Sequence, residues 1–518
     1  MTPIIIAVCY FAILSVVIGM ISKRKTKSAS DFTKSSQGLG WVMMAFAFTL
    51  IPLGAGHTLS LWESAPALGA SVMWWGIVTG GIFLPIMMLW LGPIVRQSGC
   101  NNIPEILEHV IDKKFGRLNA GVNIATWTGI GSSETLATAT AIYGLGGYRL
   151  EGHLPGNPFV WCTLFALILI IIYVIFGGIL QMAMLNVVNA IVMIAGSYTA
   201  LALLGGWLAA NVGGWEGIKE IYEGMGTVGM LSSYDLGNSM MWTNVIIPVA
   251  VLHITAGAVG QNMNSPFFAA KTDADCRKGV FLGTFFNIAA SVPWICMALT
   301  AAAITLTPSL QNLLPNLIGN ENAAKLNPIE LALTALPAPI VGLLMVSLLC
   351  ATLSTGGATI MANANILTNE IFKKALKPDM SEETRFKLMR ISVLICGAFF
   401  ATPAFLNAVI FPIFLWCFSF GIPVFVIYVM GLHVRRNITA AWITIIVAYA
   451  VNFYWTFLTP PWAANYLNGA FSLNMYPVTI VSVILGVILP LVLPGGKPPF
   501  LQKGQDFAAA DRLAAQAE

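Results

Sequence analysis

Three residues in the middle of one long apolar segment have the chemistry of a cation site. Ala351, Ser354 and Thr355 stand three and four positions apart, so they lie on one face of a helix. Two hydroxyl oxygens on that face, next to the small Gly356 and Gly357, could replace part of the hydration shell of a dehydrated hard cation without adding a full negative charge. The same residue types also let membrane helices approach each other closely, so the pattern alone leaves both interpretations open.

Ionisable side chains inside apolar segments form a second group of candidates, because a charge within a bilayer is costly and usually serves a function. They are His57, Glu63, Glu134 and His253. The predicted substrate-binding residues are His57, Ser133, Glu134, His253 and Thr255. The alternatives are an interior hydrogen bond for Glu134, core positions bonded to carbonyls for the two histidines, and a solvated position near the outer membrane surface for Glu63. Several tryptophans could offer aromatic faces to an amine or ammonium, although interfacial anchoring is their commoner role: Trp62, Trp74, Trp75 and Trp127.

The composition shows which elements must position these residues. Hydrophobic residues make up 57% of the chain, charged residues make up 9%, and the mean hydropathy is +0.80. These values exclude a water-soluble globular protein and predict an all-α polytopic membrane protein. The first apolar run, residues 3–22, lacks a basic segment before it and a small-residue cleavage site, so we expect a retained helix. The eight cysteines predict no disulfide framework, because they fall in expected spans or cytoplasmic loops.

Apolar runs predict about thirteen transmembrane helices. The expected spans are 3–22, 39–68, 71–94, 118–146, 159–177, 179–205, 242–263, 279–305, 337–371, 390–408, 410–433, 438–457 and 475–494. If the N-terminus lies outside, every Lys and Arg except Arg149, Lys219 and Lys325 falls on the cytoplasmic side. This distribution predicts a multi-pass protein of the cell membrane with an outer N-terminus and a cytoplasmic C-terminus.

Two of the expected spans read as interrupted helices. In the second, Pro52 and Gly54 follow Ile51 at mid-membrane, where a missing N–H leaves backbone carbonyls free. The seventh contains Pro248, Gly257 and Gly260 within a few turns. Backbone that is broken at membrane depth is tolerated only where it is buried or lines a cavity. The two spans are five apart, which predicts a five-plus-five inverted repeat of the LeuT-like type at helices 2–11, with ligands bound at the breaks.

This organisation divides the chain into four expected parts. Residues 1–38 form the first helix and a cytoplasmic loop, 39–433 the transport core, 434–496 two additional helices, and 497–518 a cytoplasmic tail. Within the core, Asn102, Pro104 and Glu105 predict the start of a short surface helix that ends near Gly116.

Several stretches together resemble the sodium:solute symporter family, which includes sodium/proline and sodium/galactose symporters. The resemblance covers about residues 1–440 and rests on the order and spacing of Ser28 to Phe32, Leu39 to Trp41, Asn102 to Glu105, Phe176 to Ile179, Ala269 to Lys271 and Ala351 to Phe372. It implies a sodium-binding set made of the carbonyls of Leu50, Leu53 and Ala351 and the hydroxyls of Ser354 and Thr355. The residues themselves independently indicate the same helix and the same break.

The chain also departs from the family pattern. Asn186 and Asn189 stand where the family usually has Asp and Gln, and Ser265-Pro266 replaces the usual Gln-Arg. An Asp at position 186 would offset the charge of a second ion, whereas Asn offers one neutral oxygen. We therefore expect one sodium ion per cycle, held by neutral ligands, and a substrate other than the familiar sugars or proline.

The predicted function is a sodium-coupled symporter that imports a small polar organic solute by alternating access, and the candidate solutes are amine-bearing or zwitterionic. The expected partners are that solute, the sodium ion and the lipid bilayer. No cofactor, enzymatic activity or nucleic-acid binding is expected, since no phosphate-binding loop, metal-ligand spacing or nucleophile motif is present in the sequence. A proton-coupled or uncoupled carrier of the same fold is the alternative, and a membrane sensor domain is a less favoured one. The sequence leaves the oligomeric state open.

Overall fold

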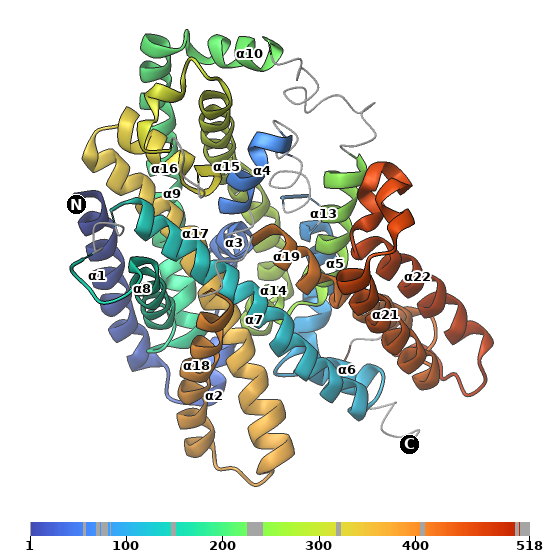
Figure 1. The fold of residues 1–518 in the computed structure, drawn as a ribbon. Helices are drawn as coiled ribbons and strands as arrows, with labels where there is room; N and C mark the ends of the chain where they lie inside the picture. Colours follow the sequence, from blue (N-terminus) through green and yellow to red (C-terminus); the bar gives the residue numbers. More distant parts are fainter. Residues whose placement is uncertain are drawn as a thin grey trace.

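The computed structural model describes residues 2–54, 58–68, 73, 81–82, 84–146, 152–224, 242–317, 323–404, 410–502 and 507. Within these ranges the chain is helical, and its extended pairings are two isolated β-bridges, Leu39 with Ala270 and Arg436 with Lys497. The all-α prediction is therefore confirmed for the described part of the chain. Figure 1 shows the helices gathered into one bundle, with α3, α7 and α17 near its centre in this view.

The helices of the first half of the chain are α1 (Thr2–Lys25), α2 (Ala29–Lys34), η1 (Ser35–Gln37), α3 (Trp41–Leu50), η2 (Ile51–Leu53), α4 (Leu59–Leu68), α5 (Leu84–Gln97), α6 (Ile103–Val110), α7 (Lys113–Gly144), α8 (Pro158–Ile172), α9 (Gly178–Asn211), α10 (Gly214–Gly224), η7 (Trp242–Ile246), α13 (Ile247–Leu252), η8 (His253–Gly257) and α14 (Gln261–Ala269).

Those of the second half are α15 (Asp273–Leu306), η9 (Gln311–Leu313), η10 (Pro315–Leu317), α16 (Ala323–Ala335), α17 (Ala338–Ile366), η11 (Leu367–Leu376), α18 (Glu382–Ala404), α19 (Ile410–Ser419), α20 (Gly421–His433), α21 (Ile438–Leu458), η12 (Pro461–Ser472) and α22 (Met475–Val492).

Seven described helices are long and apolar enough to cross a membrane, and a bent pair at residues 242–269 could be an eighth span. Several of the predicted spans are divided or short in the structure: 39–68 consists of α3, η2 and α4, and 159–177 contains the 15-residue α8. The multi-pass prediction holds in this coarser form. The count of thirteen spans stays a prediction.

The second predicted span is interrupted where the sequence places Pro52. Helix α3 ends at Leu50, the chain makes the 3-10 turn η2, and Gly54 leaves the helical region with φ −50° and ψ −154°. Proline cannot donate the hydrogen bond that would continue α3, so the carbonyls at its end are free for other partners. The predicted break is confirmed.

The seventh predicted span is interrupted as well. Wide π-helical turns at η7 and η8 flank α13, and Gly260 is extended with φ −70° and ψ 130° before α14 begins. The two parts of this pair meet at an angle of 46°. Both interrupted spans therefore present non-helical backbone inside the bundle.

Small residues hold α3 in place. Helix α15 packs along α3, and a Cβ atom on Gly279 would lie 2.3 Å from the Cβ of Met44, while one on Gly283 would lie 2.7 Å from the carbonyl oxygen of Ala45. Any side chain at these glycines would push the two helices apart. The Leu39–Ala270 bridge then fixes the start of α3, with Lys271 N–H donating to Leu39 O at 2.9 Å.

One predicted boundary is wrong. The short helix α6 begins as expected, with the Asn102 side chain accepting a hydrogen bond from the Glu105 N–H at 2.9 Å. It ends at Val110, however, and not near Gly116, because Asp112 caps a new helix by accepting from the Phe115 N–H. The capping signal of Asp112 starts α7 one turn earlier than the apolar pattern indicates.

Candidate ion and substrate site

The predicted cation ligands meet at the point where the end of α3 and η2 touch α17. Ala351, Ser354 and Leu50 are fully buried, and Thr355 is 4% exposed. The Oγ1 atom of Thr355 lies 2.8 Å from the carbonyl oxygen of Ile51, 3.3 Å from that of Leu50 and 3.3 Å from that of Ala351. The helix break and the hydroxyl face of α17 are thus brought together.

This cluster holds more oxygen acceptors than hydrogen donors. The Thr355 hydroxyl has a single hydrogen, yet three carbonyl oxygens surround it. The Oγ of the neighbouring Ser354 is buried and has no hydrogen-bond partner among the described residues. Oxygens that outnumber the available hydrogens suit a hard cation such as sodium, which accepts lone pairs and needs no hydrogen.

The carboxyl group of Glu134 lies beside this cluster. A Cβ atom placed on Gly54 would lie 2.2 Å from Oε1 of Glu134 and 2.6 Å from Oγ1 of Thr355, so both oxygens press against the backbone of Gly54. A Cβ on Gly356 would approach the Cβ of Glu134 at 3.4 Å. Glu134 is fully buried on α7, and only glycine at position 54 leaves room for it next to the helix break.

The sequence and the fold have relatives among known transporters. The model of the family described as "Sodium:solute symporter family" matches residues 32–447. The chain belongs to the sodium:solute symporter family. It is a multi-pass membrane transporter, not an enzyme, and this membership implies sodium as its coupling ion.

One curated protein and one solved structure are similar to this symporter. A sodium/glucose cotransporter of Vibrio parahaemolyticus is 22% identical over 410 residues, which are 75% of this symporter and 73% of the relative. A solved structure of a Na⁺-coupled sialic acid symporter, in a substrate-bound outward-open state, superposes with a TM-score of 0.75 at 16% identity and covers 96% of this chain and 99% of that one.

The fold is also similar to that of Mhp1, a nucleobase-cation-symport-1 family transporter solved in a closed conformation with bromovinylhydantoin bound. The TM-score is 0.56 at 11% identity, covering 94% of this chain and 98% of the other. These structures support the LeuT-like fold that the interrupted helices predict. The inverted repeat itself stays a prediction.

The remaining predicted ion ligand, Leu53, lies in the turn at the break. Leu53 is buried in η2, but its carbonyl makes no hydrogen bond to α17 in the part of the symporter that the structure describes. His57 lies outside the described residues, and nothing is described of the side chain of Glu63. Thr58, which follows that gap, donates to the Gly54 carbonyl at 3.2 Å.

The other substrate candidates bond within their own helices. Ser133 donates to Gly129 O at 3.1 Å, and Thr255 donates to Val251 O at 2.6 Å. His253 is buried in η8, with Nδ1 2.8 Å from Val249 O and its ring 6.2 Å from that of Phe418. No described contact joins His253 or Thr255 to the cluster at Thr355, so the structure places these two residues at the second break and Glu134 at the first.

Sequence reasoning missed Asn287, a buried amide on α15. Its side-chain nitrogen donates to the Thr49 carbonyl at 3.0 Å, one residue before the end of α3, and its oxygen has no hydrogen-bond partner among the described residues. An amide in an otherwise apolar run, Phe-Phe-Asn-Ile, was the available signal. The rings of Trp62 and Trp294 lie 5.9 Å apart on α4 and α15, and the indole N–H of each is also unpaired within the described part. These unpaired groups are further candidates for solute contact.

Asn186 lies in a separate polar network. Tyr173 donates to Oδ1 of Asn186 at 2.8 Å and accepts from Nδ2 of Asn189 at 2.8 Å, while Tyr10 donates to Oδ1 of Asn189 at 3.0 Å. The ring of Tyr173 packs against α17 at Gly357, where an added Cβ would lie 2.9 Å away. The side-chain oxygen of Asn186 therefore already accepts one hydrogen bond, and the neutral amide brings no charge to offset that of a cation.

Proposed function

We propose that this symporter binds one sodium ion between α3–η2 and α17, and uses it to import a small polar organic solute by alternating access. The ligands are the carbonyls of Leu50, Leu53 and Ala351 and the hydroxyls of Ser354 and Thr355. The observation that carries the proposal is the excess of acceptor oxygens around Thr355, together with the unpaired Ser354 hydroxyl.

The position of this site supports a coupling role. Its oxygens come from two elements about 300 residues apart in sequence, and a cation between them holds these elements together. A ligand that binds one conformation better shifts the protein towards it, and a solute that favours the same conformation binds more tightly when the ion is present. We propose that residues 39–433 form the core that undergoes this change.

The coupling is tested by uptake into proteoliposomes under an imposed sodium gradient. Uptake should be driven by the gradient and should cease when potassium replaces sodium on both sides. Equal uptake of every tested solute in sodium and in potassium would contradict sodium coupling and would favour an uncoupled carrier.

The solute itself is proposed from the groups near the two breaks. Glu134 at the first break suits an amine or ammonium, and His253 at the second break could pair with a carboxylate, so a zwitterion could use both. Thermal-shift screening of the purified protein, with and without sodium, should show sodium-dependent stabilisation by amine-bearing or zwitterionic solutes. The panel of solutes includes glucose and sialic acid, because the names of the two similar transporters contain these solutes. Stabilisation by uncharged sugars or nucleobases alone would contradict the amine proposal.

A proton-coupled carrier is the second candidate, favoured by one observation. The carboxyl group of Glu134 is fully buried at the break, where a change in its protonation would alter the charge next to Thr355. Uptake driven by a pH gradient in the absence of sodium would favour this candidate. We propose the cell membrane as the location, with an outer N-terminus and a cytoplasmic C-terminus.

A further inference from the structure

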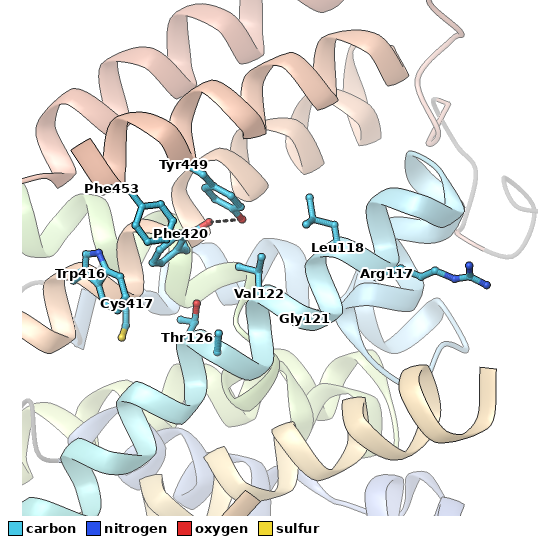
Figure 2. A pocket seen from close by; sticks show the side chains of 11 residues that line it. Arg117, Leu118, Gly121, Val122, Thr126, Trp416, Cys417, Phe420, Tyr449 and Phe453 are labelled. Atoms are coloured by element: carbon cyan, nitrogen blue, oxygen red, sulfur yellow. Dashed lines mark hydrogen bonds between the residues drawn. The ribbon is translucent and has the colours of Figure 1, made fainter. Parts of the chain in front are cut away.

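A cavity of about 480 Å³ lies between α7, α19 and α21, away from the ion site. Figure 2 shows its lining side chains converging from these three helices. Most of the lining is aliphatic or aromatic, including Leu118, Val122, Trp416, Phe420 and Phe453. Such a surface suits a hydrocarbon chain and not a polar solute.

The cavity lies where lipid can reach it. Helix α21 is one of the candidate membrane spans, and Phe453, which lines the cavity, is 47% exposed. Other large apolar side chains on α21 are also exposed, including Ile446 at 60% and Phe457 at 69%. This helix therefore presents its outer face to the bilayer. The opening of the cavity beside it is exposed to the acyl chains of lipids.

The dimensions of the cavity match one leaflet of a membrane. Its lining on α7 runs from Arg117 to Thr126, which is about 14 Å along the helix axis at about 1.5 Å per residue. Half of a hydrocarbon core of about 30 Å is about 15 Å. A chain that begins at the level of Arg117 thus reaches the middle of the bilayer near Thr126, whose hydroxyl points towards the cavity in Figure 2.

Basic side chains at one end of the cavity indicate which lipid headgroup would bind there. Arg117 is exposed at its edge, and Lys113 and Lys114 lie one turn earlier on α7. Within the described part of the chain none of these three side chains forms an ion pair. A guanidinium group binds a phosphate through two parallel hydrogen bonds, and basic residues at a membrane surface attract anionic lipids.

We propose that this cavity binds one anionic phospholipid of the bilayer, with an acyl chain between α7, α19 and α21 and its phosphate on Arg117. The site is distinct from the sodium and solute site and does not depend on the proposed function.

The position of the cavity gives the lipid a mechanical role. Val122, Thr126 and Phe420 also line a smaller space that reaches Ala256 and Gly260, where the seventh predicted span is broken. Phe420 itself separates α19 from α20, and a Cβ on the next residue, Gly421, would lie 2.5 Å from the Cβ of Ala256. A chain in the cavity therefore packs beside the contact between α20 and the break in the seventh predicted span, so its presence changes how fast that break moves.

Lipid binding is tested directly on the full-length protein. The purified protein in detergent is titrated with dioleoyl-phosphatidylglycerol or with dioleoyl-phosphatidylcholine, and native mass spectrometry counts the bound lipid. We expect one phosphatidylglycerol molecule to bind about tenfold more tightly than phosphatidylcholine. Equal binding of the two lipids to the wild type would overturn the assignment of the headgroup to Arg117.

Two substitutions test the contributions of the lipid headgroup and of the acyl chain to binding separately. Arg117→Gln should remove the preference for phosphatidylglycerol, whereas Lys114→Gln, an equal loss of charge outside the cavity, should keep most of it. Gly121→Phe should abolish tight binding of both lipids, because nothing lies within 4 Å of a Cβ at Gly121 and the ring can enter the cavity. Gly206→Phe, at an equally open position on α9, is its control.

Unchanged lipid binding in Gly121→Phe, or equal weakening by Arg117→Gln and Lys114→Gln, would overturn the proposal. Solute uptake in liposomes of the two lipids gives the second readout: the wild type should respond to phosphatidylglycerol and Gly121→Phe should not. A failure of sodium coupling would leave the mass-spectrometric result unaffected.

Discussion

Two regions of the continuous stretch α17–η11, the middle of α17 and the end of η11, are built in opposite ways. In the middle of α17, Thr355 lies among carbonyl oxygens that outnumber its one hydrogen, and Ser354 has no partner within the described residues. At the end of η11, Lys374 lies 2.9 Å from Glu108, 3.0 Å from Glu370 and 3.7 Å from Glu105.

The charged cluster of Lys374, Glu105, Glu108 and Glu370 joins η11 to α6, and neighbouring amide groups donate hydrogen bonds to its carboxylates. Asn102 donates to Glu370 at 2.8 Å, and the Asn101 N–H donates to Glu105 at 2.6 Å. Each carboxylate of the cluster thus accepts a hydrogen bond or forms an ion pair. In this contact the protein supplies its own cation for the carboxylates, with the buried Oε1 of Glu108 left without a hydrogen-bond partner among the described residues, whereas no cationic side chain is described beside the oxygens around Thr355.

The largest effect should come from the incomplete site. The double variant Ser354→Ala/Thr355→Ala removes two ligands, and we expect the apparent sodium affinity to fall by about 100-fold, with about tenfold for each single change, since a hydrogen bond or ligand to a charge is worth about 1.5–3 kcal/mol. Sodium-dependent uptake in proteoliposomes measures it.

The controls for this variant lie on the same helix. Ser347 and Thr359 are buried hydroxyls that donate within α17, to Leu343 O at 2.9 Å and to Thr355 O at 2.7 Å. Ser347→Ala and Thr359→Ala should leave the sodium affinity within about twofold, a change of under about 0.5 kcal/mol. Normal sodium affinity in the double variant would return Ser354 and Thr355 to a packing role.

Changes in the charged cluster should lower the stability of the protein and leave its sodium affinity unchanged. Lys374→Met leaves three carboxylates without their cation, and we expect a loss of about 2 kcal/mol of stability because the Glu370 side chain is 1% exposed. Thermal unfolding of the purified protein measures the loss. Lys387→Met removes an exposed pair with Glu383 and should change little.

Adding Glu370→Gln to Lys374→Met should recover part of the lost stability, since it removes the most buried of the uncompensated charges. A Lys374→Met protein with wild-type stability and impaired sodium affinity would contradict the contrast between the middle of α17 and the end of η11.

Glu134→Gln should have a smaller effect on the ion. It keeps the shape of the side chain and removes a charge beside Thr355, so we expect the apparent sodium affinity to fall about fivefold, or about 1 kcal/mol. Sodium titrations of uptake at saturating solute measure this change. Unchanged sodium affinity with lost solute binding would place Glu134 in the substrate site alone.

The smallest expected change concerns stoichiometry. Because Asn186 carries no charge and its side-chain oxygen already accepts a hydrogen bond from Tyr173, we predict a sodium Hill coefficient near one in the wild type. Asn186→Asp adds the missing charge and should raise the coefficient towards two, whereas Asn189→Asp should not. Simultaneous sodium and solute fluxes measure it, and a wild-type flux ratio of two would contradict the single-ion proposal.

The sequence was sufficient for the parts of this fold that depend on local chemistry. Pro52 removes a hydrogen-bond donor wherever it stands, so the break after α3 was predictable, and the spacing of Ser354 and Thr355 placed them on one face of α17. The order and spacing of the short stretches that resemble the sodium:solute symporter family were enough to predict membership of that family. The misplaced end of α6 came from weighing the apolar pattern above the capping chemistry of Asp112.

What depended on tertiary packing could not be predicted. Glu134 and Gly54 are 80 residues apart on different helices, and only the folded chain shows that one occupies the space the other leaves. Asn287 was passed over because an amide in an apolar run gives no sign of which neighbour it faces. The partner of Asn186, Tyr173, lies at the end of α8, and its bond to Asn186 follows from how the turn after α8 folds back onto α9 and not from any motif.

The bonds from Thr355 to the end of α3 and the start of η2 join residues that are 305 and 304 positions apart, and this sets the order in which the protein can be assembled. Synthesis at about 5–20 residues per second leaves roughly 15–60 seconds between the emergence of the two partners. During that interval the broken end of α3 must stand in the membrane without α17, and also for most of it without the glycines of α15 that later hold it. The ion site is consequently among the last parts of the core to form, so a nascent chain becomes able to bind sodium only after most of it has already been inserted.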